Sequence, residues 1–187
     1  MKSTVAVAGT VYNALRRLPA LEGRRIAVEF RQELTAHRGK LLSGRERGLP
    51  VHGGSFPRQR RIVLDAALLH RPGELSRILV HELFHFVWLR LGNRVRRSFE
   101  ALLVSEWELG ARGELGWSSQ RRKDALDLAG ARERTRKWRE YIAESFADTA
   151  AFLYSSCRRH EEYTLAPRFR ARRRDWFAEQ LAGPLRV

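Results

Sequence analysis

The sequence predicts an α+β fold in one domain that spans residues 1–187, with a small N-terminal sheet followed by a helical C-terminal part. The chain has 187 residues, 43% of them hydrophobic, which is enough for one core and short for two domains. The N-terminal third contains two segments with the alternating pattern of strands, "RRIAVEF" and "RRIVLDAAL". The remainder contains longer segments with the start and stop signals of helices.

The N-terminal region is predicted to contain one helix and two strands. A helix over about 4–18 ends at Pro19, because proline cannot continue a helix. The alternating apolar residues of "RRIAVEF" predict a strand with one buried face, and a helix over 25–36 is the alternative. The stretch 43–60 is dense in Gly, Pro and Arg, so a loop or exposed hairpin is predicted before a second strand at 61–68.

A long central helix is predicted from Pro72 to the residue before Gly92. Proline suits the first turn of a helix, and glycine suits the residue just after its end. Apolar side chains cover nearly all sides of this segment, which predicts a helix buried in the domain. A polar site on it must face a cleft or be satisfied internally.

Three further helices are predicted in the C-terminal part. The first covers about 97–108 and the second about 135–157. The Gly-rich, charged stretch between them is interpreted in part as a surface loop or insertion. The third is a basic amphipathic helix that contains "RFRARRRDWFAEQLAG" and ends at Gly183 and Pro184.

The chain is strongly basic, with 36 Lys and Arg against 21 Asp and Glu, a formal charge of +15. Such a surface attracts anions, and nucleic acid, acidic protein segments and membrane surfaces all qualify. No nucleic-acid-binding motif accompanies the charge. The single cysteine, Cys157, excludes an internal disulfide and a Cys-rich zinc site. With no convincing secretory signal and no apolar run long enough for a membrane helix, a cytoplasmic protein is expected.

The segment "VHELFHF" carries the strongest chemical signal. His81 and His85 are four residues apart on the predicted central helix, so both project from one face and can bind one metal ion. Glu82 is rotated by roughly 100° and is placed to reach a water on that metal. This His-Glu-x-x-His pattern is expected by chance in roughly one or two per cent of shuffled chains of this composition.

A catalytic zinc needs a third protein ligand, and Glu144 in "AESFAD" is the best candidate. Asp148 lies one turn further on the same helix face, where it can accept the outer N–H of a liganding histidine. Small residues around Glu144 let this helix approach another closely. Glu106 is the alternative third ligand, but no carboxylate follows it four residues later.

The two motifs together, "HELFH" and "ESFAD", resemble the gluzincin zinc metallopeptidases, and are most similar to the catalytic domain of anthrax lethal factor-like peptidases. The resemblance covers about residues 60–155. It implies a zincin-like fold, with the small sheet packed on the metal helix, and Zn²⁺ as cofactor. It also implies that His81, His85 and Glu144 bind zinc, that Glu82 is the general base and that Asp148 orients a ligand.

The sequence departs from this family at the oxyanion stabiliser. The lethal factor-type pattern has a tyrosine seven residues before the third ligand, and Lys137 stands there. Tyr141, one turn before Glu144, is the candidate replacement. Other candidates are further from the pattern and are interpreted as packing or surface residues: Tyr154, His160 and Tyr163.

The function predicted from this resemblance is hydrolysis of peptide bonds in a protein or peptide substrate, acidic if the arginines line the cleft. In such folds the strand before the metal helix, here 61–68, borders the cleft and pairs with the extended substrate. Two alternatives remain: a DNA-associated regulatory metalloprotease-like protein, and a non-enzymatic, basic nucleic-acid-binding module with an inert metal site.

Overall fold

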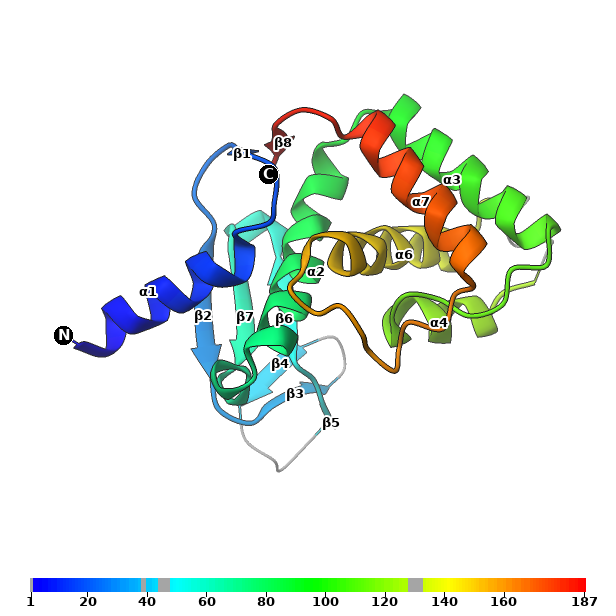
Figure 1. Cartoon of the computed structure of the whole chain (residues 1–187). Coiled ribbons are helices and arrows are strands. Elements are labelled where there is room, and N and C mark those ends of the chain that lie inside the picture. Colours follow the sequence, from blue (N-terminus) through cyan, green and yellow to red (C-terminus); the bar gives the residue numbers. More distant parts are fainter. Residues whose placement is uncertain (1, 38–39, 44–47, 128–132) are drawn as a thin grey trace.

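The computed structural model, which describes residues 2–37, 40–43, 48–127 and 133–187, contains both helices and short sheets and confirms the α+β class. The strands gather on one side of the molecule and most of the helices on the other (Figure 1). Among the helices of the described residues, none is long and apolar enough to span a bilayer. The chain starts with α1, Lys2–Leu15.

The main sheet has three strands in the order β2-β7-β6. β2, Ala27–Arg31, runs parallel to β7, Arg61–Asp65, and β6, Gly53–Phe56, runs antiparallel to β7. Ile62 and Leu64 of β7 are fully buried and belong to the hydrophobic core. Because the strand pattern at 25–31 buries one face against the core, the strand prediction is confirmed and the helical alternative over 25–36 is wrong.

The strand predicted over 61–68 is shorter than expected. β7 ends at Asp65, whose carboxylate accepts hydrogen bonds from the backbone N–H groups of Leu34 and Ala67 at 2.8 Å each. The bond from Ala67 caps a 3₁₀ helix, η2, Ala66–His70, which leads into the central helix. An aspartate that captures the N–H two residues ahead is a common way to turn the chain.

A second sheet was not predicted. It contains β3, Leu34–His37, β4, Lys40–Ser43, and β5, Leu49–Pro50, in the antiparallel order β4-β3-β5. Its strands have two to four residues, too few to show a clear period. The predicted loop over 43–60 also contains β6 and a 3₁₀ helix, η1, Pro57–Gln59; its residues 44–47 lie outside the described part of the chain.

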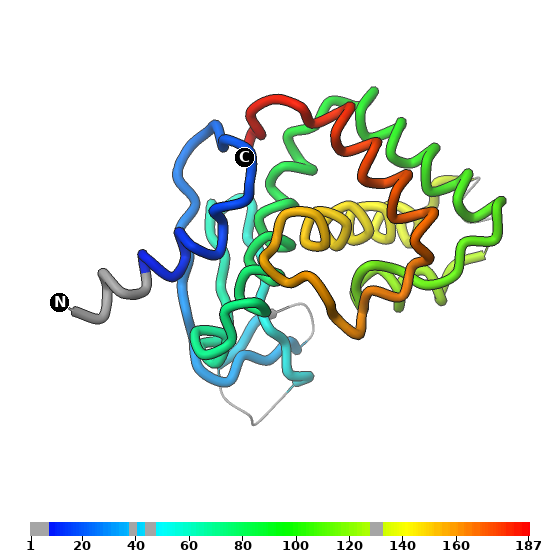
Figure 2. The backbone as a smooth tube through the Cα atoms, viewed as in Figure 1, coloured from blue at the N-terminus to red at the C-terminus, as the bar shows by residue number. Residues whose placement is uncertain are grey.

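The central helix, α2, Pro72–Arg90, follows the prediction closely and packs between the main sheet and α6, Arg136–Tyr154. Figure 2 shows α2 and α6 crossing near the middle of the molecule. Alanines on α6 allow the close approach, and aromatic rings fill the space beside them, as in the Phe84–Phe146 pair with centroids 5.7 Å apart. The buried alanines of α6 are Ala147, Ala150 and Ala151.

The remaining helices cover α6. α3, Asn93–Glu108, begins four residues earlier than predicted, and α7, Pro167–Gln180, is the predicted basic helix. α4, Trp117–Asp124, lies in the Gly-rich, charged stretch that the sequence predicts to be in part a surface loop or insertion. Two short strands, β1, Leu21–Glu22, and β8, Leu185–Arg186, pair in parallel, so the segment after α1 lies beside the C-terminal segment.

Candidate metal centre

His81 and His85 face one another on α2 as their spacing predicts. Their Nε2 atoms are 3.2 Å apart, and the two rings meet edge to face with centroids separated by 4.9 Å. His81 is buried and His85 is partly buried. The pair therefore presents two ring nitrogens to a single point on the inner side of the helix.

Glu144 of α6 completes this group. Its Oε2 lies 3.4 Å from Nε2 of His81. One ligand atom from each of His81, His85 and Glu144 falls within 4.8 Å of the others, so these three residues could hold a metal ion. Glu106, the alternative third ligand, lies elsewhere: it is 2% exposed and ion-paired with Arg173 at 2.7 Å.

Asp148 orients His81. Its Oδ1 lies 2.7 Å from Nδ1 of His81, and because an ionised carboxylate only accepts, the histidine donates from Nδ1. Nε2 of His81 is then left free to face Glu144 and His85. The sequence predicted a contact between Asp148 and one of the histidines, and the structure contains it; that His81 binds a metal stays a prediction.

Asp148 is itself held by α4, an element that the sequence did not reveal. Its Oδ2 accepts hydrogen bonds from the Ser119 backbone N–H at 3.0 Å and from the Ser119 hydroxyl at 2.7 Å. Gly116, just before the helix, touches Asp148: a Cβ at Gly116 would lie 2.3 Å from its Cγ. The segment Gly-Trp-Ser-Ser has residue types common at helix starts, but the charges and glycines around it concealed the helix.

α4 also reaches Glu144. Nη2 of Arg122 lies 3.1 Å from Oε1 of Glu144, the oxygen that does not face His81. Two side chains of one short helix, Ser119 and Arg122, thus bind the two carboxylates that α6 contributes to the site. α4 fixes the position of both.

The buried groups of the site shift one another's pKa values in different directions. Burial raises the pKa of Glu144, but its hydrogen bond to His81 and the charges of His85 and Arg122 outweigh it, so the pKa falls to about 2. Burial, followed by the charge of His81, lowers the pKa of His85. Burial also disfavours the charged form of His81. The charge and hydrogen bond of Asp148, followed by Glu144 and Glu82, outweigh burial, so the pKa of His81 is raised. Glu144 is therefore ionised and the neutral form of His85 is favoured, whereas the raised pKa of His81 favours an imidazolium, which must lose its Nε2 proton before it can bind a metal.

Glu82 lies beside the ligands without being tied to them. It is 8% exposed, and no hydrogen bond or ion pair joins its carboxylate to another described residue. Its negative charge favours the protonated form of both His81 and His85, which places it near the two rings. For His85 this contribution is smaller than the effect of burial, which lowers the pKa. The Glu82 oxygens are not among the fully buried, unpartnered atoms of the described residues, so they keep some access to solvent.

Tyr141, the expected oxyanion stabiliser, does not join this group. It is 1% exposed, and its hydroxyl donates to Oε1 of Glu114 at 2.6 Å. Its ring packs against Trp107 and Trp138. The hydroxyl of Tyr141 points toward Glu114, which is held in place by a buried ion pair with Arg173. No pattern in the sequence indicates this ion pair. The geometry gives Tyr141 a packing role and no direct contact with the metal ligands, and the expectation is corrected accordingly.

The other residues considered for that role also have different partners. His160 lies 3.2 Å from Oε2 of Glu74, and the Tyr163 hydroxyl donates to the Cys157 carbonyl at 3.4 Å. Lys137 is exposed. Among the described residues, therefore, no tyrosine or lysine side chain forms a hydrogen bond or ion pair with His81, His85 or Glu144.

A second buried ion cluster adjoins the site along α2. Arg77, one turn before His81, is 5% exposed and pairs with Glu74 and with Oε1 of Glu162, the latter at 2.9 Å. Oε2 of Glu162 also accepts from the Trp117 backbone N–H at 2.7 Å. Glu162 thereby links α2 to the start of α4. The only sequence signal for it is the Glu74 to Arg77 spacing of three residues.

The prediction that the strand at 61–68 pairs with an extended substrate is wrong. β7 pairs with β2 on one side and with β6 on the other, so both of its edges are occupied. β6 also contacts α2, and its second edge has no strand partner in the described part of the chain. A Cβ on Gly53 of β6 would lie 3.2 Å from Ile78 of α2, which shows how closely the strand follows the metal helix.

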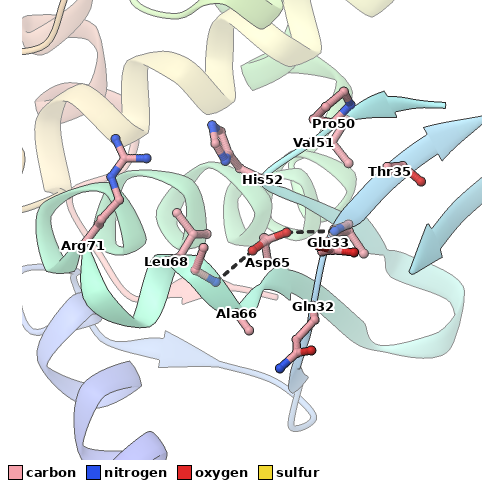
Figure 3. A pocket seen from close by; sticks show the side chains of 12 residues that line it. Gln32, Glu33, Thr35, Pro50, Val51, His52, Asp65, Ala66, Leu68 and Arg71 are labelled. Atoms are coloured by element: carbon pink, nitrogen blue, oxygen red, sulfur yellow. Dashed lines mark hydrogen bonds between the residues drawn. The ribbon is translucent and has the colours of Figure 1, made fainter. Parts of the chain in front are cut away.

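A cavity of about 570 Å³ opens at the start of β6. Figure 3 shows His52, Asp65 and Arg71 among its lining residues, with Asp65 held by its two backbone hydrogen bonds. None of the three metal-site ligands lines it. Its lining carries side chains of both charges, so it does not select for an acidic group.

Comparison of the chain with protein-family models, with curated proteins and with solved structures finds no match.

Proposed function

We propose that this protein is a zinc-dependent metallopeptidase with a zincin-like arrangement of its gluzincin-type motifs. The observation that supports it is the convergence of His81, His85 and Glu144, whose ligand atoms lie within 4.8 Å of one another. These residues come from two helices, and the second histidine, His85, and Glu144 are 144 − 85 = 59 positions apart in the sequence. A carboxylate behind one of the histidines completes the arrangement.

The donor set fits zinc. Two imidazole nitrogens and one carboxylate oxygen are the three protein ligands of many catalytic zinc sites, which keep a fourth position open. Asp148 supplies the outer hydrogen bond that fixes the ring of His81. When bound, zinc lowers the pKa of a coordinated water and polarises the carbonyl of a substrate.

Glu82 is the proposed general base. Its position after His81 and its lack of a partner among the described residues leave its carboxylate free to take a proton from the attacking water. It would then deliver that proton to the leaving amine. Asp148 and Arg122 would hold His81 and Glu144 in place without touching the substrate.

The substrate is proposed to lie along β6 as an extended strand. The second edge of β6, which has no strand partner among the described residues, offers backbone groups for pairing with a peptide. β6 runs beside α2, the helix that carries His81. A peptide on β6 would reach the cavity around His52 at one end, where a side chain of either charge or none is accommodated.

Metal content tests the site. We expect close to one zinc per chain in the purified protein, and loss of that zinc in His81→Ala and in Glu144→Ala. Glu140→Ala is the matched control, because Glu140 lies one turn earlier on α6 and forms only an exposed pair with Arg136. Unchanged zinc in Glu144→Ala would move the third ligand to another residue.

Peptidase activity tests the role of Glu82. We expect Glu82→Gln to keep its zinc and lose about 100- to 10,000-fold of the cleavage rate on a peptide library, the usual contribution of a general base. Cleavage that persists in Glu82→Gln would contradict the assignment of Glu82 as the general base. A zinc-loaded wild-type protein that cleaves no peptide would overturn the proposed function while leaving the metal site intact.

A further inference from the structure

A second cavity, of about 370 Å³, lies away from the metal ligands. It is formed where the chain after α1, the end of α6 and the middle of α7 meet. Its lining combines arginines with apolar and aromatic side chains. Its lining residues are Arg17, Phe152, Leu153, Tyr154, Arg158, Arg174, Phe177 and Ala178.

The arginines of the lining come from three separate segments. Arg17 donates to the Ser155 carbonyl at 3.0 Å but pairs with no carboxylate among the described residues. Arg158 and Arg174 are exposed, and neither forms a hydrogen bond or ion pair with another described residue. No acidic residue lines the cavity. Burial, then the charges of Arg158 and Arg16, lower the pKa of Arg17, as expected where cations crowd without counter-charge.

Aromatic rings form another part of the lining. Tyr154 stacks on Phe84 with ring centroids 5.5 Å apart and also packs against Phe177. Its hydroxyl has no hydrogen-bond partner among the described residues, and burial alone raises its pKa. The cavity thus offers a phenol O–H donor, and Phe152 adds a further ring to the wall.

We propose that this cavity binds a phosphorylated small molecule with an aromatic body, a nucleoside monophosphate being the simplest member of the class. A phosphate monoester carries about −1.5 to −2 charges at neutral pH and three acceptor oxygens. Arginine guanidinium groups match its geometry, and the Tyr154 hydroxyl supplies one more donor. The base lies among the apolar and aromatic side chains of the lining. The volume falls at the small end of ligand pockets, about 300–1,000 Å³.

Calorimetric titration of the whole protein with adenosine monophosphate tests the proposal. We expect saturable binding at one site that weakens about tenfold or more in Arg158→Ala and in Arg174→Ala, because each loses a charge-assisted hydrogen bond. Arg94→Ala is the matched control: Arg94 is an exposed arginine on α3 that does not line the cavity. Its affinity should equal that of the wild type.

Further titrations separate the two halves of the ligand. Inorganic phosphate and adenosine should each bind more weakly than the monophosphate, and Tyr154→Phe should weaken the monophosphate by about 2- to 10-fold. Glu144→Ala should bind it normally, so the result does not depend on the metal centre. Melting curves of each variant establish that it is folded.

Three outcomes would overturn the proposal. The first is no binding of adenosine monophosphate by the wild type, and the second is an equal loss in Arg94→Ala, which would mean diffuse attraction by the net charge. The third is tight binding of a single-stranded oligonucleotide that the cavity variants lose and the monophosphate does not compete for. That result would assign the arginines to nucleic acid.

Discussion

Gly116 is one residue on which the geometry of the proposed metal centre depends. Its φ of −175° is extended backbone that any residue adopts, so the position does not need glycine for its conformation. It needs glycine for space, because a Cβ would lie 2.3 to 2.4 Å from the carboxylate atoms of Asp148. The side chain of Asp148 cannot yield without losing its bonds to His81 and Ser119.

We therefore predict that Gly116→Ala weakens zinc binding by about 10- to 100-fold, the usual effect of disturbing a residue that orients a ligand. Competition with a chelator measures the affinity. Gly92→Ala is the control, since a Cβ there meets nothing within 4 Å. Equal affinities in the two variants would show that Asp148 does not position His81.

Glu114 is a second residue with a testable effect, in this case on the stability of the fold. It is 0% exposed and accepts from Arg173 at 2.8 Å, with Lys123 at 3.1 Å. Burial raises its pKa, but Arg173 and then Lys123 and Tyr141 outweigh burial, so the pKa falls from 4.5 to about 2. Because the folded-state value is the lower one, ionised Glu114 stabilises the fold above pH 4.5, and the stabilisation is lost as the pH falls toward 2.

Glu114→Gln should accordingly lower the free energy of unfolding by about 3 kcal/mol at pH 7, as expected when one partner of a buried ion pair is removed. The difference from wild type should narrow below pH 4.5. Urea unfolding at pH 7 and at pH 3 measures it, with the exposed Glu108→Gln as control. A loss of the same size at both pH values would contradict the assignment.

The residues of the metal centre were predictable to different degrees. His81, Glu82 and His85 sit on one helix, where the covalent spacing alone fixes their relation. Glu144 and Asp148 needed the additional expectation that two helices pack together. Tyr141 was placed wrongly because the direction of its hydroxyl depends on Glu114, a residue distant in sequence that no local pattern connects with it.

At the scale of elements, α4 is the structural support of the site. It has eight residues, and its first turn binds two carboxylates: the Trp117 N–H donates to Glu162 and the Ser119 N–H to Asp148. Negative groups at a helix start are favoured by the free N–H groups and the helix dipole. The partners come from the loop after α6 and from α6 itself, so α4 is fixed by tertiary contacts.

The Ser119 hydroxyl provides a test of this support. Ser119→Ala removes its 2.7 Å bond to Asp148 and should weaken zinc binding by about 2- to 10-fold, the effect of one buried hydrogen bond. Ser118→Ala should have no effect, because that side chain makes no hydrogen bond among the described residues. A chelator competition series compares the two. Equal affinities would mean that the backbone N–H of Ser119 alone holds the carboxylate.

The same element shows why part of the fold escaped prediction. A helix of two turns has low intrinsic stability and only a short periodic pattern, so tertiary contacts decide whether it forms. The strands β3, β4 and β5 are similarly short. By contrast, α2 and α6 have 19 residues each and clear ends, and the sequence located both.

At the scale of the whole molecule, α2 is shared between the sheet side and the helical side. It packs on β6 and β7 along one face and on α6 along another. The α+β class was predictable because the strand and helix patterns occupy different parts of the sequence. The parallel pairing of β1 with β8 was not, since it joins two-residue strands from the opposite ends of the chain.

A substitution at Leu185 of β8 tests how much the segment that pairs with β1 contributes to the stability of the fold. Leu185 is 3% exposed and part of the main hydrophobic core. Leu185→Ala should lower the free energy of unfolding by about 2 to 5 kcal/mol, the range for a buried leucine. Leu109→Ala, at a position 56% exposed, should cost well under that. Thermal melts of the two variants compare them, and equal melting temperatures would show that the end segment folds independently.

Gly116 also has a use in recognising relatives. Short motifs such as "HELFH" occur in unrelated chains, and "ESFAD" adds only the third ligand and its neighbour. A glycine three residues before a serine, at the positions of Gly116 and Ser119, is required here by the contact with Asp148. A search that demands this Gly-x-x-Ser pair between the two motifs would separate chains that support the aspartate in this way from those that share the motifs alone.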